Sequence, residues 1–228
     1  MSSAASDALL ASAGNVPTVL PASARRPSAD DALPLPVPLR GLLPEGVLRR
    51  GATLRVSSSA SLLLAVLGEA SRSGAWCAAV GLPTLGVAAA AAAGVDLDRF
   101  ALVPAPGGTW PTVVAALLDA LDVIAVAPRH TAPAATGAAG RRLSARARER
   151  RAVLLVVDDT RTGTGWEGVD ADLSVVGRQW EGVGLGHGYL QARSLDVLAS
   201  GRRIGGRPRT ARLHVAASGA VTSDVVQP

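Results

Sequence analysis

Residues 46–71 read GVLRRGATLRVSSSASLLLAVLGEAS, and this stretch decides the fold class. The apolar run Gly51–Ser57 begins at a glycine and is typical of a buried β-strand. A serine-rich turn follows, and Ser59–Ser71 then has the leucines and alanines of a strongly apolar helix. A strand joined so closely to a helix is typical of the units that build a parallel sheet.

The same alternation of strand and helix continues along the chain to residue 157. We predict further strands at Ala75–Val80, Phe100–Pro104, Val123–Ala127 and Val153–Val157. The intervening segments predict helices at Thr84–Gly94, Pro111–Leu121 and Arg141–Arg151. Because these strands are continuous apolar runs, they indicate a parallel sheet that is covered on both faces. Right-handed crossovers would connect them.

The pattern changes after Asp172, where three strand candidates follow one another without a helix between them. They are Asp172–Val176, Gly188–Leu198 and Arg212–Val215, joined by turns rich in glycine and arginine. The predicted fold is therefore α/β: a mostly parallel sheet flanked by helices, with an antiparallel C-terminal extension.

The two ends of the chain differ in composition from this core. Residues 1–39 are rich in alanine, serine and proline and predict a flexible N-terminal arm, with a docking arm that wraps a neighbouring subunit as the alternative. Residues 40–216 form the predicted core domain, and residues 217–228 a C-terminal tail.

Composition limits the chemistry that this chain performs. Its 228 residues fit one domain plus a tail, and 48% of them are hydrophobic but only 3% aromatic. Cys77 is the only cysteine, so no internal disulfide forms, and we expect a cytoplasmic protein with a buried thiol. All 23 basic residues are arginine, which excludes every mechanism that needs a lysine. No segment predicts a secretion signal or a membrane helix.

Several segments resemble the RecA-type recombinase core, in the order in which that family has them. They are Gly46–Val56 before and within the first core strand, GVDLDR at 94–99, LDVIAVA at 121–127, Arg142–Val157, and the arginine- and glycine-rich segment around 202–209. The resemblance covers roughly residues 40–216 and implies a RecA-like fold.

The resemblance also shows which residues of the family's ATPase chemistry are missing. A P-loop has the pattern GxxxxGK[ST], in which glycines admit the phosphates and lysine neutralises their charge. The corresponding segment here is Ser57, Ser58, Ser59, Ala60 and Ser61. Ala127 stands where a metal-binding acid is expected, and Gly81–Pro83 stands in place of the catalytic glutamate. Asp158 and Asp159 replace the phosphate-sensing glutamine. We interpret them as a solvated strand end or a turn, with metal binding as the alternative.

A RecA-like core without ATPase residues is similar to the ImuA-prime group of actinobacterial mutasomes. The resemblance implies a non-catalytic accessory protein without a cofactor that acts in DNA-damage-induced translesion synthesis, the SOS mutagenesis pathway. It implies binding to an ImuB-like inactive relative of Y-family polymerases, and through it to an error-prone DnaE-type polymerase. Such a protein would be cytoplasmic and would join the nucleoid when engaged. Edge-to-edge self-association is also open to a RecA-like core.

Two arginine clusters and two tryptophans are the candidate contacts for a protein partner or for DNA. Positions 142, 146 and 150 share one face of the predicted helix, and the second cluster follows a glycine-rich turn. Arginines of this kind also serve as ordinary surface charge, or contact phosphates in a DNA-binding module, which is the alternative function. The candidates are Arg142, Arg146, Arg150, Arg202, Arg203, Arg207, Arg209, Trp166 and Trp180.

Other sites have little support in the sequence. The three histidines, His130, His187 and His214, lie far apart and near no cluster of cysteines, so a zinc site is not predicted. No GxSxG motif nominates a nucleophilic serine for a hydrolase.

Overall fold

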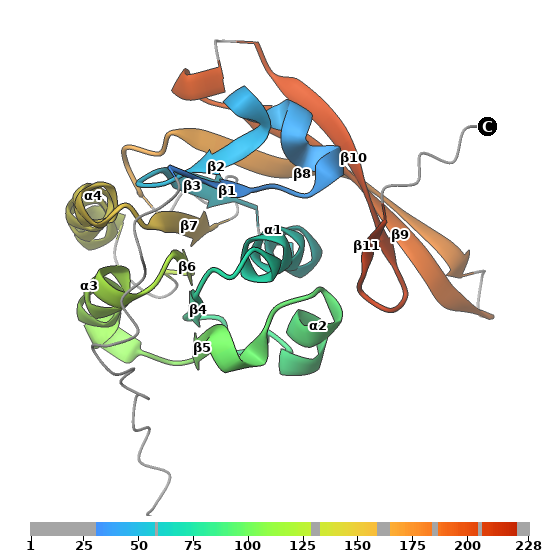
Figure 1. Ribbon diagram of the computed structural model, residues 1–228, viewed down its shortest axis with the longest axis horizontal. Coiled ribbons are helices and arrows are strands. Elements are labelled where there is room, and N and C mark those ends of the chain that lie inside the picture. The colour runs from blue at the N-terminus through green and yellow to red at the C-terminus, as the bar shows by residue number, and fades with distance from the viewer. Residues whose placement is uncertain are drawn as a thin grey trace, which may run out of the picture.

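A computed structural model describes residues 31–57, 59–128, 133–158, 165–183, 187–204 and 207–222. Its main feature is a nine-stranded sheet with the order β11-β10-β9-β8-β3-β7-β6-β4-β5 (Figure 1). The parallel strands are β3 (Thr53–Val56), β4 (Cys77–Val80), β5 (Phe100–Val103), β6 (Val123–Val126), β7 (Val153–Val157) and β8 (Ala171–Val183). The antiparallel strands are β9 (Gly188–Ser200), β10 (Arg209–Ala216) and β11 (Val221–Thr222). The predicted parallel sheet with an antiparallel C-terminal extension is confirmed.

Helices cover both faces of the parallel strands. Figure 1 shows α1 (Ala60–Arg72) and α2 (Val87–Ala92) on one side, and α3 (Trp110–Ala120) and α4 (Pro133–Arg150) on the other. Short 3-10 turns connect some of the elements: η2 (Val37–Leu42), η3 (Pro44–Gly46), η4 (Leu97–Arg99), η5 (Gly107–Thr109) and η6 (Arg202–Ile204). None of the described helices is long and apolar enough to cross a membrane.

The strands divide their side chains between two hydrophobic cores. In β6, Val123 and Ala125 belong to the core with α1, whereas Ile124 and Val126 belong to the core with α3 and α4. Successive strand side chains point to opposite faces, so a strand buried on both faces must be apolar at every position. This requirement explains the continuous apolar runs of the sequence.

The core begins earlier in the chain than predicted. Strand β1 (Ala32–Pro34) pairs antiparallel with β2 (Val47–Arg49), and η2 packs close to β10. The expected boundary at residue 40 is therefore wrong, because apolar side chains of this segment enter the core: Leu33, Leu35, Leu39 and Leu42. The proline-rich composition hid them, since proline suits both flexible chain and the first turn of a 3-10 helix.

Boundaries elsewhere in the chain also differ from the expectation. Helix α4 begins at Pro133, well before Arg141, although Gly137 and Gly140 lower its helix propensity. Glycine at position 140 leaves room for the Trp166 indole, because a Cβ there would lie only 2.9 Å from that ring. At the other end, residues 217–222 turn back and pair as β11 with β10, and so the predicted tail is partly folded.

Candidate functional site

The connection between β3 and α1 is where a RecA-like ATPase would hold phosphate. Strand β3 ends at Val56 and α1 begins at Ala60, so only residues 57–59 join them. The backbone N–H of Ser57 donates to the Leu173 carbonyl at 2.9 Å, and its hydroxyl accepts from the Val175 N–H at 3.1 Å. These bonds fix the connection against β8.

The remaining serines of this segment belong to the start of α1. Ser59 is the N-cap, and its hydroxyl accepts from the Leu62 N–H at 3.4 Å. Ala60 and Ser61 lie in the first turn of the helix, and Ser58 lies outside the described residues. The Ser57 and Ser59 hydroxyls thus have partners within the chain.

The ends of the neighbouring strands are closely packed. Ala127 is buried and its N–H donates to the Val80 carbonyl at 2.9 Å. A Cβ on Gly81, which has a φ of +74°, would lie 2.5 Å from the Ala127 carbonyl oxygen. Asp158 is buried at the end of β7, so the prediction that it is solvated is wrong, and Asp159 lies outside the described residues. Among the described side chains no three of His, Cys, Asp or Glu gather as a metal site would require.

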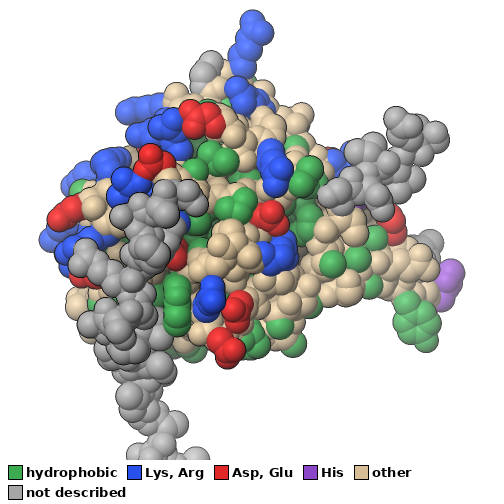
Figure 2. Space-filling view, in the orientation of Figure 1, with side chains coloured by type: hydrophobic (Ala, Val, Ile, Leu, Met, Phe, Trp, Pro, Cys, Tyr) green, Lys and Arg blue, Asp and Glu red, His purple; other side chains and the backbone are tan. Residues whose placement is uncertain are grey.

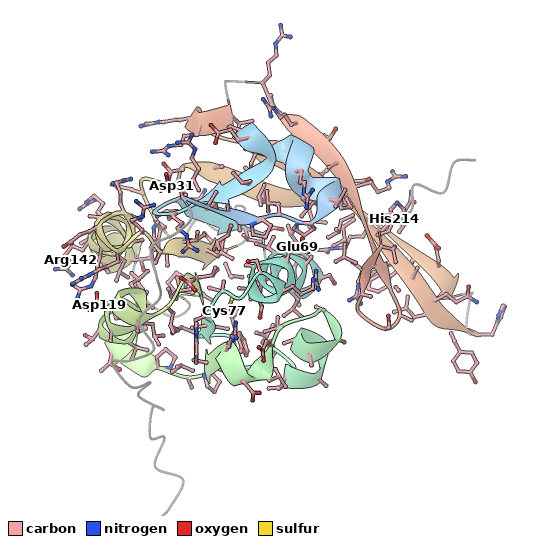
Figure 3. All side chains as sticks on the ribbon, in the orientation of Figure 1. Asp31, Glu69, Cys77, Asp119, Arg142 and His214 are labelled. Carbon is pink, nitrogen blue, oxygen red and sulfur yellow. The ribbon has the colours of Figure 1, made fainter. Side chains whose placement is uncertain are left out.

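The α4 arginines do not form the free basic face that their spacing predicts. Arg146 and Arg150 both contact Asp119 of α3, at 2.5 and 2.9 Å. Hydrogen bonding from Arg146, with the charges of both arginines, holds the pKa of Asp119 below its ordinary value. Arg142 is exposed on the same helix, and Figure 3 places both Arg142 and Asp119 at the α3–α4 side of the molecule.

The second arginine cluster likewise contains both arginines with partners in the chain and exposed ones. Arg203 in η6 contacts Asp170 at 2.9 Å, and Arg209 donates to the Gly41 carbonyl at 3.3 Å. Arg202 and Arg207 are exposed. In Figure 2 arginines gather over the α4 side and the upper rim, with acidic residues between them. These surfaces are therefore only partly available to an anionic partner.

The two tryptophans are in opposite environments. Trp166 is only 2% exposed, donates from Nε1 to the Ser144 hydroxyl at 3.2 Å, and lies 5.9 Å from the Trp110 ring. Its candidacy as a partner contact is corrected, because α4 leaves space for the ring at Gly140 and the indole belongs to the core. Trp180 is 57% exposed and remains a candidate.

Trp180 belongs to a projecting arm formed by β8 and β9. Both strands have 13 residues, and in Figure 1 they extend well beyond the helices that cover the rest of the sheet. Trp180 pairs directly with Arg193, two positions from the pair of Arg178 with the buried Leu195. Its indole therefore lies on the face of the sheet that is buried nearer the body.

The sequence did not identify the other exposed apolar residues of this arm. They are Val176, Val183 and Tyr189, the last of which is 90% exposed. The prediction ended the first strand at Val176, because polar residues and glycines follow it. The available signal was the pair of tryptophan and tyrosine residues in segments that were otherwise polar.

The histidines form no shared site among the described residues. His187 is exposed near the end of the arm, and His214 forms a 2.9 Å contact with Ser194 as its cross-strand neighbour. Figure 3 places His214 on the antiparallel part of the sheet. His130 lies outside the described residues.

Comparison with known proteins assigns a family. Residues 41–167 match the family described as the MT3502 N-terminal domain. The chain belongs to this family. A curated relative is the uncharacterized protein Rv3395c of Mycobacterium tuberculosis (strain ATCC 25618 / H37Rv), 36% identical over 121 residues. The match covers 52% of this chain and 55% of the relative. The chain thus spans about half the length of this curated relative.

This chain also has a structural neighbour. The crystal structure of the RadB recombinase superimposes with a TM-score of 0.58 at 16% identity, covering 82% of this chain and 97% of that one. At this identity the likeness shows the fold alone. The RecA-like fold that the sequence predicts is confirmed.

Proposed function

We propose that this chain is a non-catalytic RecA-like scaffold of DNA-damage-induced translesion synthesis that binds an ImuB-like relative of Y-family polymerases. The observation that carries the proposal is a RecA-like core whose β3–α1 connection has only three residues. An exposed apolar arm supports it. The identity of the partner, and its link to a DnaE-type polymerase, come from the resemblance to the ImuA-prime group.

The β3–α1 connection supports the absence of ATP hydrolysis. A P-loop needs a stretch of several residues that includes glycines to wrap around a phosphate, and a lysine to neutralise the phosphate charge. Here residues 57–59 lack glycine, and the whole chain lacks lysine. The described serine hydroxyls are already bonded to β8 and α1.

The β8–β9 arm supports partner binding. Trp180, Val183 and Tyr189 are more than half exposed, which is unusual for large apolar residues placed on the same arm. Tryptophan and tyrosine contribute most of the binding energy in many protein interfaces. The arm is therefore the surface that we assign to the partner.

An assay of phosphate release from ATP with Mg²⁺ tests the first half of the proposal. We expect no hydrolysis above the uncatalysed rate, because no group replaces the P-loop lysine. Phosphate release that increases in proportion to the amount of protein would contradict the scaffold proposal.

Replacing Trp180 with alanine tests the second half. Affinity purification from DNA-damaged cells should recover ImuB-like and DnaE-like proteins with the unaltered chain. We expect Trp180→Ala to weaken the partner complex by about thirtyfold or more, as for an interface residue worth about 2 kcal/mol.

Val87→Ala is the matched control, since Val87 is 47% exposed on α2, away from the arm. Equal affinity of both variants would remove the arm as the docking surface.

A further inference from the structure

A cavity of about 380 Å³ lies at the amino end of the parallel strands, opposite to the β3–α1 connection. Arg50 precedes β3 and Arg151 precedes β7, so the parallel pairing of these strands places both at one edge. The cavity volume is in the lower part of the range of about 300–1,000 Å³ that is typical of small-ligand sites. It is lined by Asp31, Ala32, Glu45, Arg49, Arg50, Arg151 and Arg203.

Arg50 is the buried anchor of this cavity. Its side chain is only 4% exposed, and Nη1 donates to Asp122 at 3.2 Å. Its Nε and Nη2 are buried without a hydrogen-bond partner. A buried guanidinium with unused donors is costly, and an oxyanion that these donors reach through a small shift of the Arg50 side chain would supply the missing acceptors.

Two of the other arginines can exchange their acidic partners for an anion. Four arginines line the cavity, and Arg50 and Arg203 are paired with Asp122 and Asp170 outside the lining, whereas the two acids of the lining are Asp31 and Glu45. Both acids are exposed: Asp31, which contacts Arg151, by 90%, and Glu45, which contacts Arg49, by 61%. Exposed ion pairs contribute little energy, so these arginines are readily transferred to a ligand.

Backbone conformation sets this cavity apart from the rest of the described chain. Glu45 and Arg151 have φ values of 61° and 58°, and they are its only two non-glycine residues with positive φ. Both line the cavity. This conformation is unfavourable for residues with a Cβ, and retained strain of this kind concentrates at binding sites.

We propose that the cavity binds a phosphoryl group, held by Arg50 from below and by Arg49, Arg151 and Arg203 at the rim. The planar guanidinium matches two phosphate oxygens with parallel hydrogen bonds, which makes arginine well suited to phosphate recognition. The phosphoryl group belongs either to a small phosphorylated molecule or to a nucleic-acid backbone. The site is independent of the partner-binding arm.

Calorimetric titrations of the full chain at low salt test the site. The probes are inorganic phosphate, pyrophosphate and a single-stranded oligonucleotide. We expect Arg151→Gly to weaken binding about tenfold or more, because a charge-assisted hydrogen bond is lost. Glycine suits the positive φ of this position, so the variant keeps its melting temperature and a loss of binding cannot be ascribed to unfolding.

Two further variants sharpen the test. Glu45→Gln removes a carboxylate that competes for Arg49, and we expect it to strengthen anion binding. Arg178→Ala is the matched control, because Arg178 is an exposed arginine of β8 outside the cavity. It should leave phosphate affinity unchanged.

The outcomes separate the two sources of phosphate. Pyrophosphate binding that the oligonucleotide does not displace indicates a small phosphorylated ligand. Tighter binding of the oligonucleotide, with a salt slope that falls by about one in Arg151→Gly, indicates a nucleic-acid backbone. Absence of binding by all three probes, or equal affinity of Arg151→Gly and the unaltered chain, would overturn the proposal.

Discussion

At the scale of single residues, Cys77 shows how burial determines reactivity. Desolvation, with a smaller effect from the Asp122 charge, raises the pKa of its thiol to about 12. Since the thiolate is the reactive form, we expect the folded protein to resist alkylation by maleimide or iodoacetamide up to about pH 10. The thiol should react quickly in denaturant. Rapid labelling of the folded chain at pH 8 would contradict the burial of β4.

The same shift has a consequence for stability. The pKa of the thiol is higher in the folded state than in the unfolded state, where its ordinary value is about 8.5. The unfolded chain therefore loses its proton first as the pH rises, and this group disfavours folding above about pH 9. Urea titrations between pH 8 and pH 11 should show stability falling, and Cys77→Ser separates this contribution from that of other groups.

At the scale of elements, α3 and α4 are linked by Asp119 and its two arginines. The pKa of Asp119 is lowered in the folded state, so its stabilisation is present above the unfolded value of about 3.9. It is lost as the pH falls through the lower folded value. We expect Asp119→Asn to cost up to about 1 kcal/mol at pH 7 and almost nothing near pH 2. Asp98→Asn, in the exposed turn η4, is the control for urea unfolding.

Elements were predicted best where burial on both faces forces a continuous apolar run. Strand β7, Val153–Val157, has the predicted bounds, and α1 differs by one residue at each end. Helix α4 was predicted too short, because its glycines lower local propensity while the Trp166 ring that packs on Gly140 comes from a distant segment. The cavity at Arg50 was not predicted, since its residues are brought together only by sheet pairing.

At the scale of the whole molecule, the N-terminal segment completes the core. Leu39 in η2 is fully buried, so Leu39→Ala should lower the free energy of unfolding by about 2–5 kcal/mol. Val37→Ala is the matched control within the same 3-10 turn, because Val37 is 55% exposed. We expect that change to stay within about 0.5 kcal/mol. Equal effects in a urea titration would show that η2 does not pack on the core.

The three residues between β3 and α1 also have a consequence for timing. Molecular machines that hydrolyse a triphosphate use the energy released to dissociate their complexes and start a new cycle. On the proposed function this scaffold has no hydrolysis step that ends its complexes, so the lifetime of a complex is set by its intrinsic dissociation rate. Its occupancy follows the concentrations of the two proteins by mass action. The amount of complex would then depend on the synthesis and degradation of the two proteins, because these set the number of copies in the cell at a given moment.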